Sequence, residues 1–154
     1  MKIKIATQNN IDDICMLYQE LFSDMAILQP TFFQSAHQNK LFVQNIIMSP
    51  NSDILIAVDH HETLVGFALI QELETPPFNC FVNHHYAYLM DIIIASTHRN
   101  KGIGSSLINE VKTWAQSRNL DYIELNVLTK NVSAIKLYEK HKFKNVIQTM
   151  RYTL

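Results

Sequence analysis

The sequence contains very little glycine: three residues in a chain of 154, against roughly 7% in an average protein. Two of them, Gly102 and Gly104, are separated by a single residue. Glycine permits positive φ angles and lets another group approach the main chain closely. Since the chain uses glycine so sparingly and then twice in one turn, we expect a ligand to lie against the main chain there.

Cysteine, net charge and long apolar runs are also scarce. Cys15 and Cys80 have neither the number nor the spacing of a disulfide framework or a zinc site, which favours a reducing, cytoplasmic setting and no bound metal. Thirteen basic and fourteen acidic residues give a net charge of -1, too weak a field to indicate nucleic acid or an anionic membrane as partner. No window approaches the roughly 20 apolar residues of a membrane span, and no signal peptide is expected.

Hydrophobic residues, in contrast, make up 47% of the chain, enough for the core of a single domain over residues 1–154. Their spacing in the first half predicts a strand at 2–6, a helix from 11 to about 28, a helical segment from about 24 to 49 with an aromatic kink, and a hairpin of strands at 53–58 and 64–73. His60 and His61 fall in the hairpin turn, where a solvated turn is a better interpretation than a metal site.

The second half is predicted to alternate strands and helices around the glycine turn. A proline-containing loop at 74–83 precedes an apolar strand at 86–95, and a helix begins after Gly102. A strand at 122–128 follows that helix, and because a strand-helix-strand crossover joins parallel strands, these two strands should run parallel. A short helix at 131–141 and a strand at 146–152 that closes the sheet complete the prediction.

The start of the helix after Gly102 indicates an anion site. A helix N-terminus presents unpaired N–H groups and the positive end of its dipole, and Arg99 and Lys101 add two cations. A Walker loop is excluded because the pattern G-x-x-x-x-G-K-[ST] is absent. A dinucleotide fingerprint would need a third glycine where Leu107 stands, which disfavours it, although Glu124 lies where the ribose-binding acid would.

Two segments resemble the GNAT family of N-acetyltransferases. Arg99 to Gly104 looks like the R/Q-x-x-G-x-G/A loop that binds the acyl-CoA pyrophosphate, and Asn131 to Tyr138 with Phe143 resembles the segment N-x-x-A-x-x-L-Y-x-x-x-x-F. The order of predicted elements is similar to that of the whole family fold. The resemblance implies an α/β (α+β) fold: a single GNAT-like domain with a central, mixed, mostly antiparallel twisted sheet flanked by helices on both faces. One departure is Lys142, where many members carry a glycine.

The resemblance also implies acetyl-CoA as the acyl donor. Its pyrophosphate would lie on main-chain amides of the glycine loop, and its pantetheine arm between strands that splay apart at Ala95 and Leu128. Main-chain groups beside the arm would polarise the thioester carbonyl. Asn131 would contact the arm, and an N-cap role is compatible with that contact. The residues implied in cofactor binding are Ile92, Ile93, Ile94, Arg99, Asn100, Lys101, Gly102, Ile103, Gly104, Ser105 and Asn131.

Two side chains are implied in catalysis. Tyr138 matches the family position proposed for the general acid that protonates the departing thiolate, and apolar packing is the alternative. Asp91, an acid in an apolar strand, is the first candidate for the general base that an ammonium substrate requires. A structural carboxylate is an equal alternative, since Met90 stands where some members carry a glutamate. The weaker candidates for the base are Glu72, Glu124 and His85.

The expected function is transfer of an acetyl group from acetyl-CoA to a primary amine, first of all that of a small molecule, by direct attack in a ternary complex. A protein N-terminus or lysine as acceptor, and a non-catalytic acyl-CoA-binding module, are the alternatives. A homodimer stays open as the assembly. An acidic mouth for a cationic acceptor, or else a solvated face, would be formed by Glu20, Asp24, Glu72 and Glu74.

Overall fold

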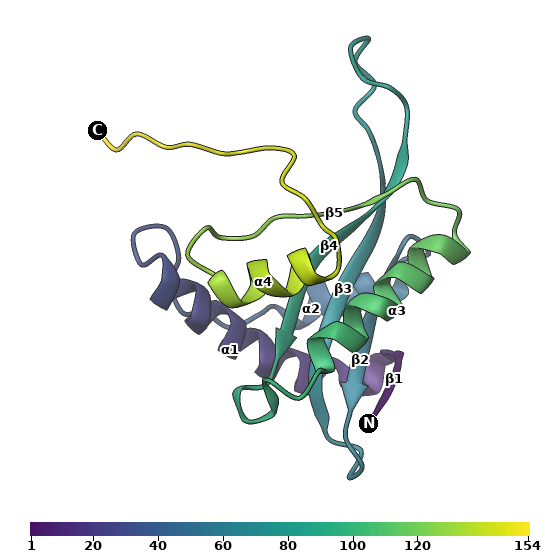
Figure 1. The fold of residues 1–154 in the computed structure, drawn as a ribbon. Coiled ribbons are helices and arrows are strands. Elements are labelled where there is room, and N and C mark those ends of the chain that lie inside the picture. Colours follow the sequence, from purple (N-terminus) through teal and green to yellow (C-terminus); the bar gives the residue numbers. More distant parts are fainter.

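The computed structural model describes residues 1–154, which form five strands and four α-helices (Figure 1). In chain order these are β1 (Lys2–Ile5), α1 (Ile11–Leu28), α2 (Lys40–Met48), β2 (Ser52–Val58), β3 (Leu64–Glu74), β4 (His85–Ile94), α3 (Ile103–Ser117), β5 (Ile123–Leu125) and α4 (Val132–Lys140). Short 3-10 turns at Gln8–Asn10 and Ser96–His98 lead into α1 and toward α3.

The strands form one sheet in the order β1-β2-β3-β4-β5. Neighbouring strands are antiparallel except β4 and β5, which run parallel because α3 crosses over between them. The predicted parallel pair and the mixed, mostly antiparallel sheet are therefore confirmed. The β3–β4 hairpin extends well beyond the other strands, at the top of Figure 1. Its loop contains Pro76 and Pro77, as expected for the proline-containing loop at 74–83.

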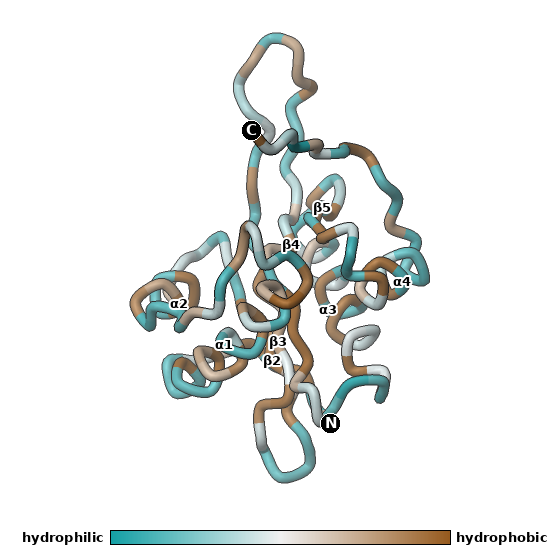
Figure 2. The backbone as a smooth tube through the Cα atoms, turned by 90° about the vertical axis from the view of Figure 1, so that its left-hand side faces the viewer, coloured by the Kyte–Doolittle hydropathy of each residue, from teal (hydrophilic) through white to brown (hydrophobic).

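The helices cover both faces of the sheet, as expected. Figure 2 shows α1 and α2 on one side of the central strands and α3 and α4 on the other. Each side buries its own apolar cluster: Tyr18 and Phe67 belong to the cluster under α1, and Leu107 and Trp114 to the cluster under α3. Strands β2 and β3 supply residues to both clusters, because successive side chains point to opposite faces. Their nearly continuous apolar sequence follows from burial on both faces.

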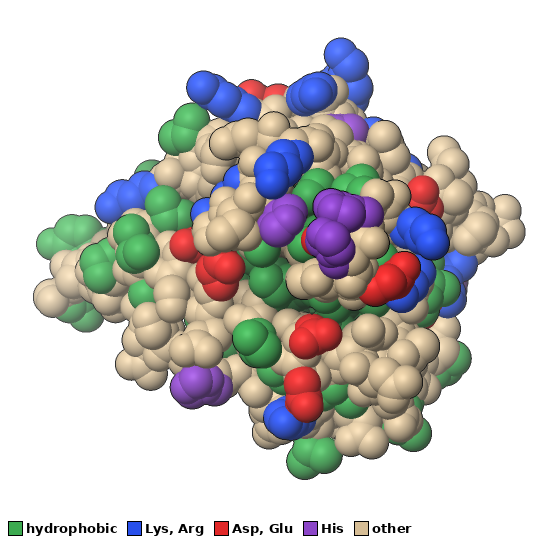
Figure 3. All heavy atoms as spheres, turned by 90° about the horizontal axis from the view of Figure 1, so that it is seen from below, with side chains coloured by type: hydrophobic (Ala, Val, Ile, Leu, Met, Phe, Trp, Pro, Cys, Tyr) green, Lys and Arg blue, Asp and Glu red, His purple; other side chains and the backbone are tan.

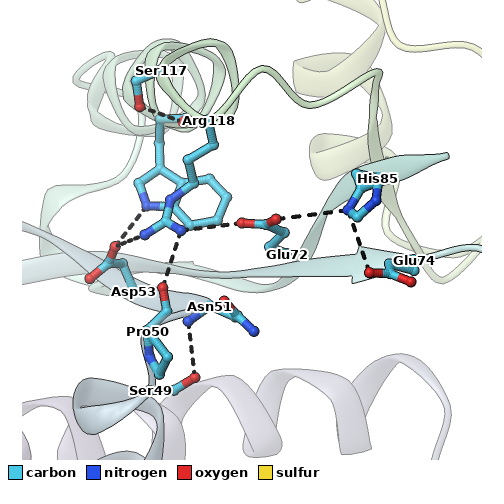
Figure 4. Close-up of polar contacts among 10 residues, drawn as sticks. Ser49, Pro50, Asn51, Asp53, Glu72, Glu74, His85, Ser117 and Arg118 are labelled. Carbon is cyan, nitrogen blue, oxygen red and sulfur yellow. Dashed lines mark hydrogen bonds and ion pairs between the residues drawn. The ribbon is translucent and has the colours of Figure 1, made fainter.

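Arg118 fastens the C-terminal end of α3 to the sheet (Figure 4). Its guanidinium donates to the Pro50 carbonyl at 3.1 Å and pairs with Glu72 at 3.2 Å and Asp53 at 3.5 Å. The guanidinium also lies 4.3 Å from the ring centre of Trp114, whose indole N–H donates to Asp53 at 2.7 Å. This network ties α3 to β2 and β3, and so fixes the helix whose other end begins at the glycine loop.

The prediction of one helical segment from 24 to 49 is wrong between its two helices. Helix α1 ends at Leu28, and residues 29–39 are irregular. Helix α2 starts after Asn39, whose side chain accepts a hydrogen bond from the Leu41 N–H as an N-cap. Pro30 explains the break, because proline removes a helical hydrogen bond and its ring clashes with the preceding turn.

The strand predicted at 146–152 is also wrong. Residues 144–154, called the tail below, have no secondary structure and run away from the body of the protein in Figure 1. Apolar and polar residues alternate there as in a strand, but a strand requires a neighbour for its main-chain groups, and the tail pairs with none in its own chain. Its large apolar side chains are consequently exposed: Val146 by 79%, Ile147 by 80%, Met150 by 85% and Tyr152 by 88%.

The surface carries charges of both signs. On the face in Figure 3, lysines and arginines are interspersed with aspartates and glutamates. His60 and His61 lie in the β2–β3 turn with ring centres 3.9 Å apart. No three histidine, cysteine, aspartate or glutamate side chains come together as a metal site requires. None of the helices combines the length and apolar character needed to cross a membrane.

Candidate active site

A gap opens in the sheet along the second half of β4. Strand β5 pairs with β4 only over Ala87–Leu89, and the chain leaves the sheet after β5. Residues 90–94 therefore have β3 on one side and no strand on the other. The predicted separation of the two parallel strands is present, and it leaves the edge of β4 at residues 92–94 without a neighbouring strand. On this stretch the Ile94 carbonyl accepts a hydrogen bond from the Arg99 side chain.

A β-bulge in β4 decides which face Asp91 points to. The register with β3 skips Met90, which has no partner. Strict alternation would place Leu89, Asp91 and Ile93 on one face. Instead Leu89 belongs to the cluster under α3 and Ile93 to the cluster under α1, because the extra residue reverses the alternation. Asp91 accordingly turns toward α1.

Asp91 is held by a tyrosine of α1. The Tyr18 hydroxyl donates to Asp91 Oδ2 at 2.7 Å, the one hydrogen bond to this carboxylate from the protein. Burial raises the pKa of the Asp91 carboxyl above its ordinary value, and the hydrogen bond from Tyr18 opposes part of that rise. Burial and the adjacent carboxylate raise the pKa of Tyr18 as well, so the phenol keeps its proton. Oδ1 of Asp91 stays free of protein partners.

The turn before α3 presents a row of main-chain amides. Gly102 has φ +81°, in the left-handed region, with nothing within 4 Å of where a Cβ would stand. Asn100 has a positive φ of 61°. The N–H groups of residues 100–105 donate to no acceptor within the protein. Free amides at the positive end of a helix dipole are the arrangement that binds phosphate.

Gly104 allows α4 to pack against the first turn of α3. A Cβ at this position would stand 3.0 Å from Cδ2 of Leu137, which is closer than a side chain tolerates without displacement. Asn131 caps α4, since its Oδ1 accepts a hydrogen bond from the Ala134 N–H at 3.2 Å. The N-cap role left open for Asn131 is confirmed, and the two sequence segments meet in space.

The Arg99 side chain points to α1. Its guanidinium donates to Asp24 at 2.7 Å, to Glu20 at 3.0 Å and to the Ile94 carbonyl at 3.0 Å. Glu20 also accepts a hydrogen bond from the Ser96 N–H at 2.7 Å. Helix α1 therefore braces the loop that carries the free amides. Because Arg99 pairs with both carboxylates, Glu20 and Asp24 do not form the open acidic mouth considered from the sequence.

Tyr138 lies in α4 with 8% of its surface exposed. Its ring packs against Phe143 at 5.8 Å between ring centres. Burial raises the pKa of Tyr138 to about 12, and the negative charge of Asp91 adds to the rise. Tyr138 belongs to the cluster under α3, against which Ile92 and Ile94 of β4 also pack. At neutral pH the Tyr138 phenol keeps a proton that it can donate.

The weaker candidates for the base have other partners. Glu72 pairs with Arg118, and His85 lies 4.0 Å from Glu72 and 3.7 Å from Glu74 (Figure 4). These residues belong to the network at the C-terminal end of α3. Glu124 lies near Tyr86 and Tyr122, whose pKa values are raised first by burial and then by its negative charge. None of the three hydrogen-bonds to Asp91 or Tyr138.

Sequence reasoning missed Tyr18 and Glu20 as parts of the site. Tyr18 has the helical spacing of a core residue, and its ring is indeed in the core. No pattern in the sequence indicates that its hydroxyl meets a carboxylate 73 residues away. For Glu20 the sequence suggests an acidic mouth or a solvated face, whereas the structure shows it accepting hydrogen bonds from the loop before α3.

The model of the acetyltransferase (GNAT) family matches residues 14–143, from α1 through the β4 bulge and the glycine loop to the end of α4. The chain belongs to this family. The GNAT resemblance of the two sequence segments is thereby confirmed. The family is one of acetyltransferases.

Relatives of this GNAT chain include antibiotic-modifying enzymes. Streptothricin acetyltransferase of Escherichia coli is 46% identical over 57 residues, which are 37% of this chain and 33% of that enzyme, so only a third of its length is matched. A tetramutant of the BH1408 protein of Bacillus halodurans has a TM-score of 0.94 at 23% identity over 100% of both chains. Aminoglycoside N-acetyltransferase AAC(6')-Iy, solved with CoA, has a TM-score of 0.76 at 14% identity over 99% of this chain and 98% of that one. At these identities the two structures show a shared fold.

The residues of this GNAT domain fit acetyl-CoA. The free amides of residues 100–105 suit a pyrophosphate, which takes several directed N–H bonds. Lys101 adds a positive charge beside them, and its ammonium donates to the Thr97 carbonyl at 3.1 Å. No strand lies beside β4 at residues 92–94, so main-chain groups there that neither β3 nor Arg99 uses can pair with an amide-containing pantetheine arm.

Lys142, the departure from the GNAT pattern, lies just after α4 at φ +71°. This left-handed conformation costs a residue with a Cβ about 1 kcal/mol or more. Lys142→Gly should therefore stabilise the protein by roughly 0.5–1 kcal/mol, after allowance for the greater freedom of glycine in the unfolded chain. Urea unfolding measures the difference, and Lys144→Gly, where φ is not positive, is the control that should not stabilise. A midpoint for Lys142→Gly equal to or below that of the parent would contradict the account.

Proposed function

We propose that the protein transfers the acetyl group of acetyl-CoA to a primary amine of a small molecule, by direct attack in a ternary complex. The observation that supports this most directly is the position of Asp91 and Tyr138. Asp91 lies on β4 just beyond its pairing with β5, and Tyr138 belongs to the cluster against which Ile92 and Ile94 pack. The carboxylate is partly buried, and the raised pKa of Tyr138 keeps the phenol protonated. Residues 100–105, residues 92–94 and Asn131 would hold the donor, and Arg99, paired with α1, would brace the loop that carries the amides.

An acceptor amine must first lose a proton. An alkylammonium with a pKa of about 10.4 costs roughly 4–5 kcal/mol to deprotonate at pH 7, so a base is required. The free Oδ1 of Asp91 can accept that proton, directly or through water. Because burial raises the pKa of Asp91, the carboxylate binds a proton more readily than an exposed one. The base is active only when ionised, so activity should fall as pH decreases through the Asp91 pKa.

The departing thiolate, in contrast, must gain a proton. Bound acetyl-CoA supplies an activated thioester, and cleavage of its C–S bond leaves negative charge on sulfur. The Tyr138 hydroxyl donates to no protein group, so its proton is available to that sulfur. A base and an acid in one environment keep both charge changes inside the site.

The acceptor class rests on the relatives. Streptothricin and an aminoglycoside, named as substrates of two of them, are small molecules, which supports a small amine rather than a protein N-terminus or lysine. The alternative of a non-catalytic acyl-CoA-binding module leaves the arrangement of Asp91 and Tyr138 without a use.

Incubation with acetyl-CoA and a panel of amines tests the function. Streptothricin, aminoglycosides, polyamines, lysine peptides and peptides with free N-termini form the panel. We expect mass spectrometry to show an added acetyl group on at least one small-molecule amine, with free CoA released in equal amount. Acetylation of peptides alone would contradict the acceptor class, and binding of acetyl-CoA without transfer would favour the non-catalytic module.

Two tyrosine variants are controls for this experiment. Tyr138→Phe should lower kcat about 10²-fold, the lower range for loss of a general acid, with little change in acetyl-CoA affinity by calorimetry. Tyr122→Phe removes the hydroxyl of a tyrosine that stacks on Tyr86 at 4.9 Å and should leave kcat unchanged. Equal kcat values for wild type and Tyr138→Phe would remove Tyr138 from the role of acid.

We further propose that the protein is a homodimer joined by the tail. The tail exposes alternating apolar side chains, and β5 at the end of the sheet order has one free edge. A tail that pairs with β5 of a second copy would cover the apolar side chains of the tail and give the free edge of β5 a hydrogen-bonded neighbour. Within its own chain the tail contacts the protein through the Arg151 guanidinium, which lies 4.3 Å from the ring centre of Phe32.

Sedimentation velocity of the full chain and of residues 1–143 tests this assembly. We expect a dimer for the full chain and a monomer for the shortened one, because only the full chain can exchange its tail. A full chain that is monomeric, or a shortened chain that is still dimeric, would show that the tail does not join two copies.

A further inference from the structure

Tyr18 is completely buried, with 0% of its surface exposed. Ring centres of Phe67 and Phe22 lie 4.8 Å and 5.3 Å from its own, and Phe42 stands edge-on at 6.4 Å. These contacts from β3, α1 and α2 fix the ring. Since the ring cannot move freely, the direction of the hydrogen bond from its hydroxyl to Asp91 is fixed as well.

We propose that Tyr18 is a positioning residue for acetyl transfer: its hydroxyl holds Oδ2 of Asp91 and leaves Oδ1 for the acceptor ammonium. This inference rests on the proposed function, in which Asp91 is the general base. A carboxylate without that contact would present either oxygen in changing orientations, and a rigid donor to one oxygen removes this freedom. A hydrogen bond to the ionised form also favours ionisation, which keeps the base available inside the core.

The other groups that face Asp91 do not take over this role. From α4, Tyr138 is a neutral phenol at neutral pH, since its pKa is raised to about 12. From α1, Cys15 lies near the Tyr18 hydroxyl, and burial raises the pKa of its thiol. From β3, the residue opposite Asp91 is Leu69. Removal of the Tyr18 hydroxyl would therefore leave the effect of burial unopposed, and the pKa of Asp91 would rise.

Tyr18→Phe tests the inference because it removes the hydroxyl and keeps the packed ring. We expect the acidic limb of the pH profile of kcat/KM to move to higher pH by about one unit, with a lower kcat and unchanged acetyl-CoA affinity. Tyr122→Phe is the matched control and should keep the wild-type profile. A Tyr18→Phe profile that coincides with that of the wild type overturns the inference.

Two further measurements separate this inference from the proposed function. Asp91→Asn should abolish the acidic limb, and Tyr18→Phe added to it should shift nothing further; a wild-type profile for Asp91→Asn refutes Asp91 as the base. Carbon-13 NMR titration of the Asp91 carboxyl, without any acceptor, tests the contact itself. A higher Asp91 pKa in Tyr18→Phe than in the wild type supports the inference, and equal values overturn it whatever the activity.

Discussion

The structure depends on one break in strand pairing: β5 leaves β4 after Leu89. If the parallel ladder continued, the main-chain groups of residues 92–94 would be used within the sheet, and no donor arm could pair with them. The crossover through α3 brings the free amides of residues 100–105 to the same region. The open edge of β4 and these amides therefore lie in one region as a result of the same crossover.

Helix α1 acts on both halves of this site. Tyr18 reaches the carboxylate of Asp91 from inside the core, and Glu20 holds the loop before α3 through Arg99 and the Ser96 N–H. The first contact is shielded from solvent, so its electrostatic effect is strong, whereas the second is exposed and mainly restricts the loop. One helix thus places the proposed base and supports the loop proposed to bind phosphate, so both depend on its packing against β3.

Much of this could be predicted from the sequence. The spacing of hydrophobic residues predicted most helices and strands, because it depends on residues close together in the sequence. The strand-helix-strand order then predicted that β4 and β5 are parallel. The two sequence segments identified the glycine loop and α4. The bulge at Met90 was beyond prediction, since a skipped residue leaves the apolar pattern of β4 unchanged. The partner of the Tyr18 hydroxyl and the unpaired tail were likewise beyond it, because each depends on groups far away in the chain or outside it.

We propose that acetyl-CoA lies along the open edge of β4 with its pyrophosphate on the amides before and within the first turn of α3. Hydrogen–deuterium exchange with and without acetyl-CoA measures this most directly, because it reports on the amides themselves. We expect added acetyl-CoA to slow exchange in residues 100–105 and 92–94 more than elsewhere. Unchanged exchange in both segments while acetyl-CoA is bound, or protection confined to another part of the chain, would contradict it.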